Sequence, residues 1–327
     1  MPPLRNEASQ SPALHSASFS TVPQIIPSLS ITKRRFKQVE SICLIREQRA
    51  SGRQELAFNA RPFVLCGLPL RRPPATQVLH RRRNGRFFLH IVAHPDFGLP
   101  FGQDRLIAIW VATLALRQKS RELHFDSAAQ MLDFFHLPKD GPHYRRLVDG
   151  FKRLFGATIF FGTDDQTQSA PVIDWTRFHF FDGIKLWFNR SESENASADR
   201  HDNAITISEA FYREIDDHRI PVEREVVAAL AHAPGVLDFY VWLVWKSWTV
   251  NRAPAHVPLF SDSGLKAQLG TRDYTTEKRF TQTVISWIRR IKVLWPECPA
   301  EVSADGCRLV VRPCRASPTI KSSPSKL

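Results

Sequence analysis

Two stretches of the chain carry apolar residues at helical spacing on one side and basic residues on the other. In residues 143–155 the apolar side chains recur at intervals of three and four residues, which is the period of a helix packed on a core. Residues 274–294 show the same pattern. Because a helix turns about 100° per residue, the intervening Lys and Arg residues lie on the opposite face. Each stretch is therefore predicted to be a helix with one packed side and one exposed cationic side.

The first basic helix is predicted to follow a helix, a strand, a short helix and a turn, and to precede two β-rich runs. Asp104 at the start of the leading helix and Arg117 past its end match the helix dipole. The surrounding elements are expected at 106–116, 122–125, 126–135, 137–142, 157–161 and 172–188.

The second half of the chain repeats this order less regularly. A Trp-rich helix starts at Pro234, a short helix is expected at 261–269, and the second basic helix follows. Two short strands around 301–302 and 308–311 are joined by Asp305-Gly306, a hairpin signal. A hairpin after a helix-turn-helix pair is the order of a winged helix. The sequence thus predicts a helix-rich α+β fold with two tandem winged-helix units.

Composition suggests where these units begin and end. The first 30 residues hold seven Ser and five Pro with almost no aromatic residue, which is too little apolar surface for a core. We therefore predict a disordered N-terminal segment at 1–60, a first winged-helix domain at 61–200, a second at 201–315 and a flexible tail at 316–327.

The charge of the chain favours a polyanionic partner. There are 45 Lys and Arg against 32 Asp and Glu, giving a net charge of +13. The longest apolar stretch, Val236 to Trp245, is interrupted by Asp238 and is far short of the roughly 20 residues of a membrane span. The N-terminus lacks the apolar block of a secretory signal. We expect a cytoplasmic protein with no membrane partner and double-stranded DNA as its ligand.

The two basic helices are the predicted DNA-recognition helices. In the major groove Arg and Gln contact base edges while Lys neutralises phosphates. One cationic helix face alone is usually only solvated surface, but here the same order of elements recurs in a chain of net charge +13. The predicted DNA-binding residues are His143, Arg145, Arg146, Lys152, Arg153, Arg272, Thr275, Lys278, Arg279, Gln282, Ser286, Arg289 and Lys292.

A separate basic run lies near the start of the first domain, ahead of its predicted helices. Arg81, Arg82, Arg83 and Arg86 form either an arm that tracks the phosphate backbone or an unstructured basic stretch, which look identical in sequence. The tryptophans are expected mainly in the core, although an exposed Trp is able to stack on an unpaired base.

Enzyme, metal and cofactor motifs are not found in the sequence. There is no His-hydrophobe-His metal pair and no P-loop, and three of the four Tyr lie on apolar helix faces, which argues against strand nicking. The five Cys form no C-x-x-C pair, so neither zinc nor a disulfide scaffold is expected. The acid pairs Asp164-Asp165 and Asp216-Asp217 are typical of solvent-facing carboxylates. We expect a protein that is not an enzyme and holds no cofactor and no metal.

Four runs of sequence carry a family resemblance. They are Gly98-Leu-Pro-Phe-Gly-Gln-Asp-Arg-Leu106, Arg117-Gln-Lys-Ser-Arg-Glu-Leu123, Arg146-Leu through Lys152-Arg-Leu-Phe155, and Leu237-Asp-Phe-Tyr-Val-Trp-Leu243. Through them the chain resembles the plasmid-encoded RepA family of replication initiators from Ala93 to about Pro313. One departure is Asp140-Gly-Pro-His143, where family members have a Gly-Gly-basic cluster.

The resemblance implies an initiator that binds repeated sites at a plasmid origin in a bacterial cytoplasm. It further implies that the protein helps to open an A·T-rich segment, recruits a host replication initiator and a helicase, and represses its own gene as a homodimer. The alternative is a winged-helix transcription regulator without origin function, which would share the fold, the charge and the basic helices. Two tandem units favour the initiator, because a regulator more often pairs one winged helix with an effector domain.

Overall fold

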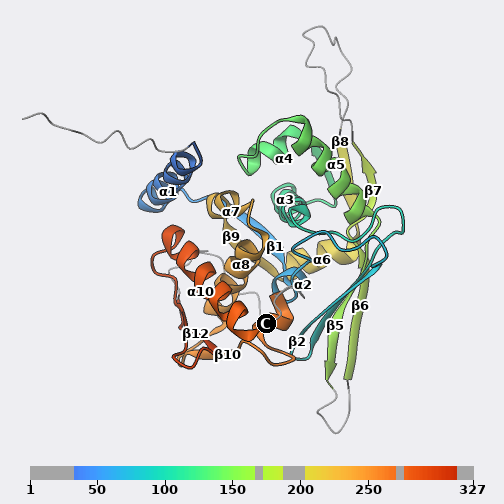
Figure 1. Ribbon diagram of the computed structural model, residues 1–327. Helices are drawn as coiled ribbons and strands as arrows, with labels where there is room; N and C mark the ends of the chain where they lie inside the picture. Colours follow the sequence, from blue (N-terminus) through green and yellow to red (C-terminus); the bar gives the residue numbers. More distant parts are fainter. Residues whose placement is uncertain (1–32, 166–171, 187–202, 270–275, 315–327) are drawn as a thin grey trace, which may run out of the picture.

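The computed structural model describes residues 33–165, 172–186, 203–269 and 276–314 (Figure 1). The helices are α1 Lys33–Ser51, α2 Arg61–Leu65, α3 Asp104–Gln118, α4 Ala129–Phe134, α5 Gly141–Phe155, α6 Glu209–Asp217, α7 Arg224–Leu230, α8 Pro234–Thr249, α9 Leu265–Leu269 and α10 Glu277–Leu294. The strands are β1 Leu56–Ala60, β2 Leu79–Asn84, β3 Phe87–Val92, β4 Glu122–Phe125, β5 Thr158–Asp165, β6 Val172–His179, β7 Phe181–Lys185, β8 Asn203–Ile207, β9 Arg219–Glu223, β10 Ala255–Pro258, β11 Ala300–Val302 and β12 Arg308–Val311.

The strands form four antiparallel sheets among these helices. Their orders are β1-β9, β2-β3-β5-β6, β4-β8-β7 and β10-β12-β11. Helix α3, whose residues 106–116 are apolar nearly all round, and the Trp-rich helix α8 are buried along most of their length. The buried apolar side chains form one connected core. The prediction of a helix-rich α+β fold is therefore confirmed.

Two parts of the chain share one order of elements. In the first part, α3, β4, α4 and α5 are followed, beyond β5 and β6, by β7 and β8, and the sheet order is β4-β8-β7. In the second part, α8, β10, α9 and α10 are followed by β11 and β12, and the sheet order is β10-β12-β11. In both sheets the strand that comes last in the chain lies in the centre and pairs with the other two strands.

The hairpin that follows α5 differs from the sequence expectation. Strands β5 and β6 pair with each other, but they extend the β2-β3 hairpin into a four-stranded sheet. The sheet that contacts α3 and α5 contains β4, β8 and β7 instead. Strand β8 therefore belongs with the first part of the chain, whereas the sequence division at residue 200 assigned it to the second. The sheet to which β8 belongs is decided by its pairing with β4, which is distant in the sequence, so no local sequence pattern predicts it.

The expected disorder at 1–60 is wrong for residues 33–60. Helix α1 reaches the rest of the protein through Arg49, whose guanidinium forms a bidentate ion pair with Glu223 at 2.9 Å and donates to the carbonyl oxygen of Leu294 at 2.7 Å. Strand β1 pairs along its whole length with β9. These contacts join residues more than 150 positions apart, so composition alone does not show them. Residues 1–32 and the predicted tail at 316–327 lie outside the described residues.

A buried ion pair joins α3 to α8. The Arg105 guanidinium contacts the Asp238 carboxylate at 2.7 and 2.9 Å, and its remaining hydrogen bonds go to the backbone carbonyls of Gly102, Leu68 and Pro69. Burial raises the pKa of Asp238 to about 6, and the charge of Arg105 opposes that shift. The first helices of the two similarly ordered parts are thus held together by a charged contact shielded from water. No helix in the described part of the chain is long and apolar enough to cross a membrane.

Candidate nucleic-acid interface

Helix α10 exposes a polar and cationic face, as its sequence predicts. Its apolar side, which includes Phe280, Val284 and Trp287, is buried. Thr276 caps the helix by accepting a hydrogen bond from the backbone N–H of Arg279. The exposed predicted residues of this helix are Lys278, Arg279, Gln282, Ser286, Arg289 and Lys292. Arg272 and Thr275 lie outside the described residues.

Helix α5 begins at a side-chain cap and exposes part of its predicted cationic face. Asp140 accepts hydrogen bonds from the backbone N–H of His143 at 2.9 Å and from the His143 ring at 2.5 Å. These hydrogen bonds lower the pKa of the Asp140 carboxyl. Arg145, Arg146 and Lys152 are exposed on the helix beyond this cap.

Arg153 lies elsewhere than the sequence pattern places it. Its guanidinium donates to both carboxylate oxygens of Asp104 at 2.6 and 2.8 Å, and it lies 4.6 Å from the ring centre of Phe101. Gly150, one turn earlier, lets α5 approach α3, because a Cβ there would lie 2.6 Å from Ile107 Cδ1 and 2.8 Å from Asp104 Oδ1. The glycine that weakens the helix is thus required by the packing that places Arg153 on Asp104. Arg153 joins α5 to α3 and does not belong to the exposed cationic face.

The basic run Arg81–Arg83 is neither a free arm nor an unstructured stretch. It forms most of β2, which pairs with β3 at the edge of the four-stranded sheet. Arg81 and Arg83 are exposed, whereas Arg82 is half-buried and its charge reaches Cys66 and Asp238 on the inner side. Arg86 lies in the turn between the two strands, with its guanidinium 5.4 Å from the ring centre of Phe87.

A cleft of about 580 Å³ lies beside α5, between that helix, α3, α4 and the segment before β2. Its basic side chains come from three segments and include Arg71, Arg72, His143, Arg146 and Arg153. Asp104 also lines the cleft but is paired with Arg153, so the arginines outnumber the carboxylate and suit the cleft to the phosphates of a polyanion. The two arginines before β2 belong to a basic stretch of the sequence, but they have no helical periodicity that would have assigned them to a site.

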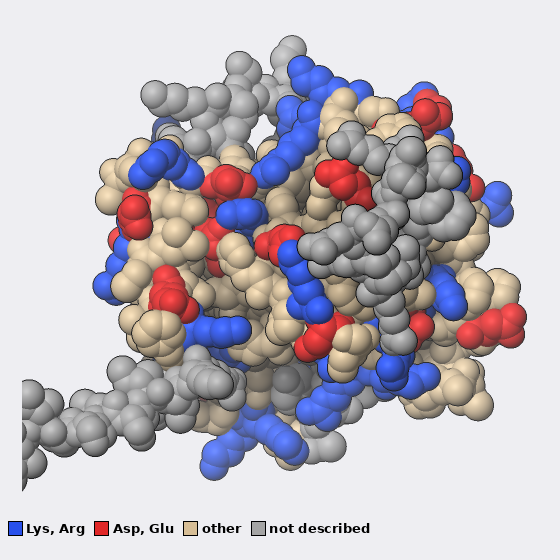
Figure 2. Space-filling view, turned by 90° about the horizontal axis from the view of Figure 1, so that it is seen from above, with Lys and Arg blue, Asp and Glu red and all other residues tan. Residues whose placement is uncertain are grey.

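Positive charge is divided among several places on the upper face of the molecule, the end at which Figure 1 shows α4 and α5. Viewed from there, groups of Lys and Arg side chains alternate with Asp and Glu (Figure 2). Helix α10 lies well away from α5 in the other view (Figure 1). The two cationic helices therefore form separate surfaces.

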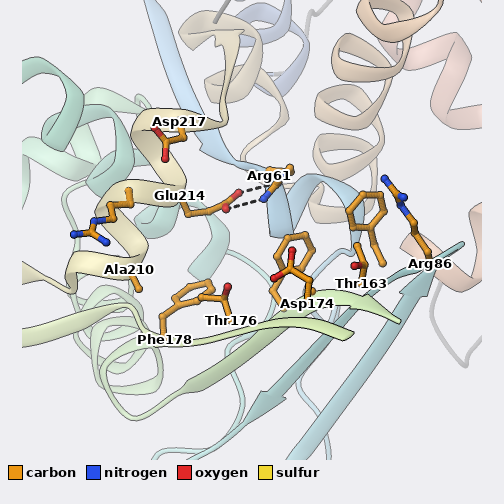
Figure 3. Close-up of a pocket in the computed structure, with 13 residues that line it drawn as sticks. Arg61, Arg86, Thr163, Asp174, Thr176, Phe178, Ala210, Glu214 and Asp217 are labelled. Atoms are coloured by element: carbon orange, nitrogen blue, oxygen red, sulfur yellow. Dashed lines mark hydrogen bonds and ion pairs between the residues drawn. The ribbon is translucent and has the colours of Figure 1, made fainter. Parts of the chain in front are cut away.

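A second cavity, also about 580 Å³, lies between α6 and the inner face of the four-stranded sheet (Figure 3). Arg61 and Glu214 point toward each other across it and form a bidentate ion pair at 2.9 and 3.0 Å. Burial raises the pKa of Glu214, and the charge of Arg61 opposes the shift. The arginines that line this cavity, Arg61, Arg86 and Arg213, are matched by the carboxylates of Glu214, Asp174 and Asp217, so the cavity is not suited to a phosphate.

Within the described residues no group of three or more His, Cys, Asp or Glu side chains is arranged to hold a metal ion. All five cysteines are free thiols, and burial raises the pKa of Cys66 to about 12 and that of Cys298 to about 11.

The exposed faces of α5 and α10 and the basic cleft place the chain among proteins with cationic surfaces suited to polyanions. Residues 145–260 match the family model described as plasmid encoded RepA protein. The resemblance expected from the sequence is thus confirmed over this region, which is about a third of the chain and runs from α5 past β10. Of the four matching runs, those at 98–106 and 117–123 lie outside it.

Two solved structures are distantly similar in fold. The crystal structure of domains 2 and 3 of RctB has 12% sequence identity and a TM-score of 0.48, and the match covers 75% of this chain and 87% of that chain. A second structure of RctB domains 2–3 has 12% identity and a TM-score of 0.45, with coverage of 73% and 83%. At these scores the likeness carries no argument about function. No curated protein matches the chain significantly.

Proposed function

We propose that the chain is a plasmid replication initiator that binds repeated double-stranded sites at the plasmid origin, with α5 and α10 as recognition helices. The observation that carries the proposal is the shared order of elements in residues 104–207 and 234–311. Helix, strand, helix, helix and two strands, with the sheet order first, third, second, is the arrangement of a winged helix. In both parts the third helix exposes cations.

The two proposed winged-helix units use different sets of side chains. Helix α10 offers a row from Lys278 to Lys292, which spans about 21 Å at 1.5 Å per residue. Helix α5 offers Arg145, Arg146 and Lys152, with phosphate contacts from the cleft beside it. Arg and Gln on these faces are suited to base edges, and Lys to phosphates. Opening of an A·T-rich segment, recruitment of a host initiator and helicase, dimerisation and autorepression belong to the proposal through the family match alone.

Duplex binding is tested by titrating the full chain with its own flanking DNA at several salt concentrations. Arg289→Ala and Arg145→Ala should each weaken specific binding by about 1–3 kcal/mol if the side chain contacts a base. Lys278→Ala should instead reduce the salt slope by about one unit. Arg252→Ala, an exposed arginine outside both helices, is the matched control and should bind as the wild type does. Binding that is indifferent to salt and to the helix substitutions would refute the recognition-helix assignment.

Origin function is tested separately from DNA binding. The gene and its flanking DNA are placed on a circle that lacks another origin, and maintenance is measured in a bacterial host. The initiator proposal expects maintenance that is lost when Arg289 and Arg145 are both substituted. Specific binding without maintenance, accompanied by a change in transcription alone, would establish the transcription regulator instead.

A further inference from the structure

The four-stranded sheet has an inner face that packs on the protein and an outer face that carries aromatic and basic side chains. Because side chains alternate along a strand, the register of the sheet assigns each residue to one face. Phe161 and Phe178 are buried on the inner face, toward α6 and α2 (Figure 1). On the opposite face Trp175 is 57% exposed, which is unusual for so large an apolar ring.

The register aligns the outer residues in three rows across the sheet. From β2 through β3 and β5 to β6, the rows are Arg83, Phe88, Gly162 and Trp175; then Arg81, His90, Phe160 and Arg177; then Leu79, Val92, Thr158 and His179. Neighbouring strands lie about 4.8 Å apart, and successive residues on one face about 6.6 Å apart along a strand. In the first two rows aromatic rings and cations are therefore close neighbours.

The exposed indole of Trp175 is held in a defined position. Its ring centre lies 5.1 Å from that of Phe88 in an edge-to-face contact. Gly162 lies directly opposite it on β5, and a Cβ at this glycine would come within 3 Å of the β6 backbone. The close approach of β5 and β6 thus depends on a glycine, and the indole covers the space beside it. An aromatic ring that is fixed on one side and open on the other is suited to stacking.

The charge on this face is positive. Arg81 and Arg177 are exposed and lie on opposite edge strands, with His90 and Phe160 between them. Among the described residues of the outer face, Asp164 is the one that carries a carboxylate, and Arg83 forms an ion pair with it at 3.5 Å. Burial and the charges of Arg81 and Arg83 lower the pKa of His90, so its ring is neutral at neutral pH.

We propose that the outer face of the sheet β2-β3-β5-β6 binds a single strand of nucleic acid, with bases stacked on Trp175 and Phe160 and phosphates on Arg81 and Arg177. Stacking on aromatic rings is largely independent of sequence because every base has a flat face, and flanking cations follow the backbone. A duplex presents no unstacked base and gains nothing from the rings. This surface is separate from α5 and α10, and the inference deepens the proposed function by giving the strand released at an origin a place to bind.

The test is a titration of the full chain with a labelled oligothymidylate of about 16 nucleotides. Trp175→Ala should weaken this binding about 5- to 150-fold, the range measured for loss of one stacked base. Trp248→Ala is the matched control, because Trp248 is 60% exposed at the end of α8 and away from the sheet. Trp175→Phe should restore most of the affinity, since it keeps a ring on Phe88. Arg177→Ala, which removes no packed ring, should lower the salt slope by about 0.7.

Duplex binding is measured on the same variants, and both Trp175→Ala and Arg177→Ala should retain it. Oligothymidylate binding equal to the wild type in both variants would overturn the inference. So would a wild type that does not bind the oligonucleotide, or variants that change only the oligomeric state, since the face would then be an interface between copies. A chain that binds oligothymidylate through this face but not its flanking duplex would refute the proposed function alone. Duplex binding without oligothymidylate binding would refute this inference alone.

Discussion

Substitution of Arg153 by alanine distinguishes a structural arginine from a DNA-contacting one. Arg153 donates two hydrogen bonds to Asp104, and the side chains of the two residues are 14% and 6% exposed. Removing one partner of a buried ion pair costs about 3–5 kcal/mol, because the other charge stays buried. Asp104 keeps the backbone N–H of Phe101 at 2.9 Å and its place at the start of α3, so the lower end of the range applies. We expect Arg153→Ala to lower the free energy of unfolding by about 3 kcal/mol.

The assay is urea denaturation of Arg153→Ala beside Arg145→Ala, an exposed arginine of the same helix whose loss should change stability by less than about 0.5 kcal/mol. Duplex affinity should respond in the opposite order, falling more for Arg145→Ala. The double variant Asp104→Ala/Arg153→Ala should lose less stability than the two single variants together, because the charges are coupled. Unchanged stability in Arg153→Ala, together with a loss of duplex affinity like that of Arg145→Ala, would refute the reasoning and return Arg153 to the DNA face.

Three further predictions concern packing, capping and pH. Gly150→Ala should destabilise the protein by about 1–2 kcal/mol, because overpacking against Asp104 outweighs the helix propensity gained. Gly141→Ala is the control and should not destabilise the protein, because no atom lies within 4 Å of a Cβ at that position. A Gly150→Ala variant more stable than the wild type would contradict this prediction. Thr276→Ala should cost about 1 kcal/mol in denaturation because α10 loses its cap, whereas Thr276→Ser should keep it. The folded-state pKa of Asp238 is raised, so its protonated form stabilises the fold below about pH 4 and that contribution is lost as pH rises through about 6. The stability of the wild type relative to Asp238→Asn should fall over this range, and a rise would show that Arg105 governs the carboxyl instead.

Helices α5 and α10 were predictable because the information that defines them is local. Apolar spacing located both helices, and the Asp140-Gly-Pro turn marked the start of α5. Strand β7 falls within the predicted β-rich run 172–188, but it joins the first part of the chain through β8, whose pairing with β4 spans about 80 residues. Local order therefore predicts the next hairpin in the sequence, β5-β6, as the wing.

The limits of periodicity are equally clear at single residues. Arg153 and Lys152 are adjacent and both oppose the apolar stripe in a helical projection, yet only Lys152 is exposed. The difference is Asp104, an acid about 50 positions earlier whose place in the sequence indicates only an interaction with the dipole of its own helix. Trp175 is an apolar residue that the structure exposes. The alternation of side chains along β6 separates the two faces of the sheet, but it does not indicate which face is covered.

The contact between α3 and α8 determines how the two proposed recognition helices act together. Each is the leading helix of its own unit, and α3 packs directly on α5 while α8 packs on α10. The Arg105–Asp238 ion pair ties the leading helices, and Arg49 of α1 joins the end of α10 to Glu223 of β9. Because the first connection is buried and the second is partly buried, rotation of one unit against the other would expose or break paired charges. The two separate cationic surfaces are thus held at one spacing, so they would bind a site with fixed spacing as one rigid body rather than as two modules on a flexible linker.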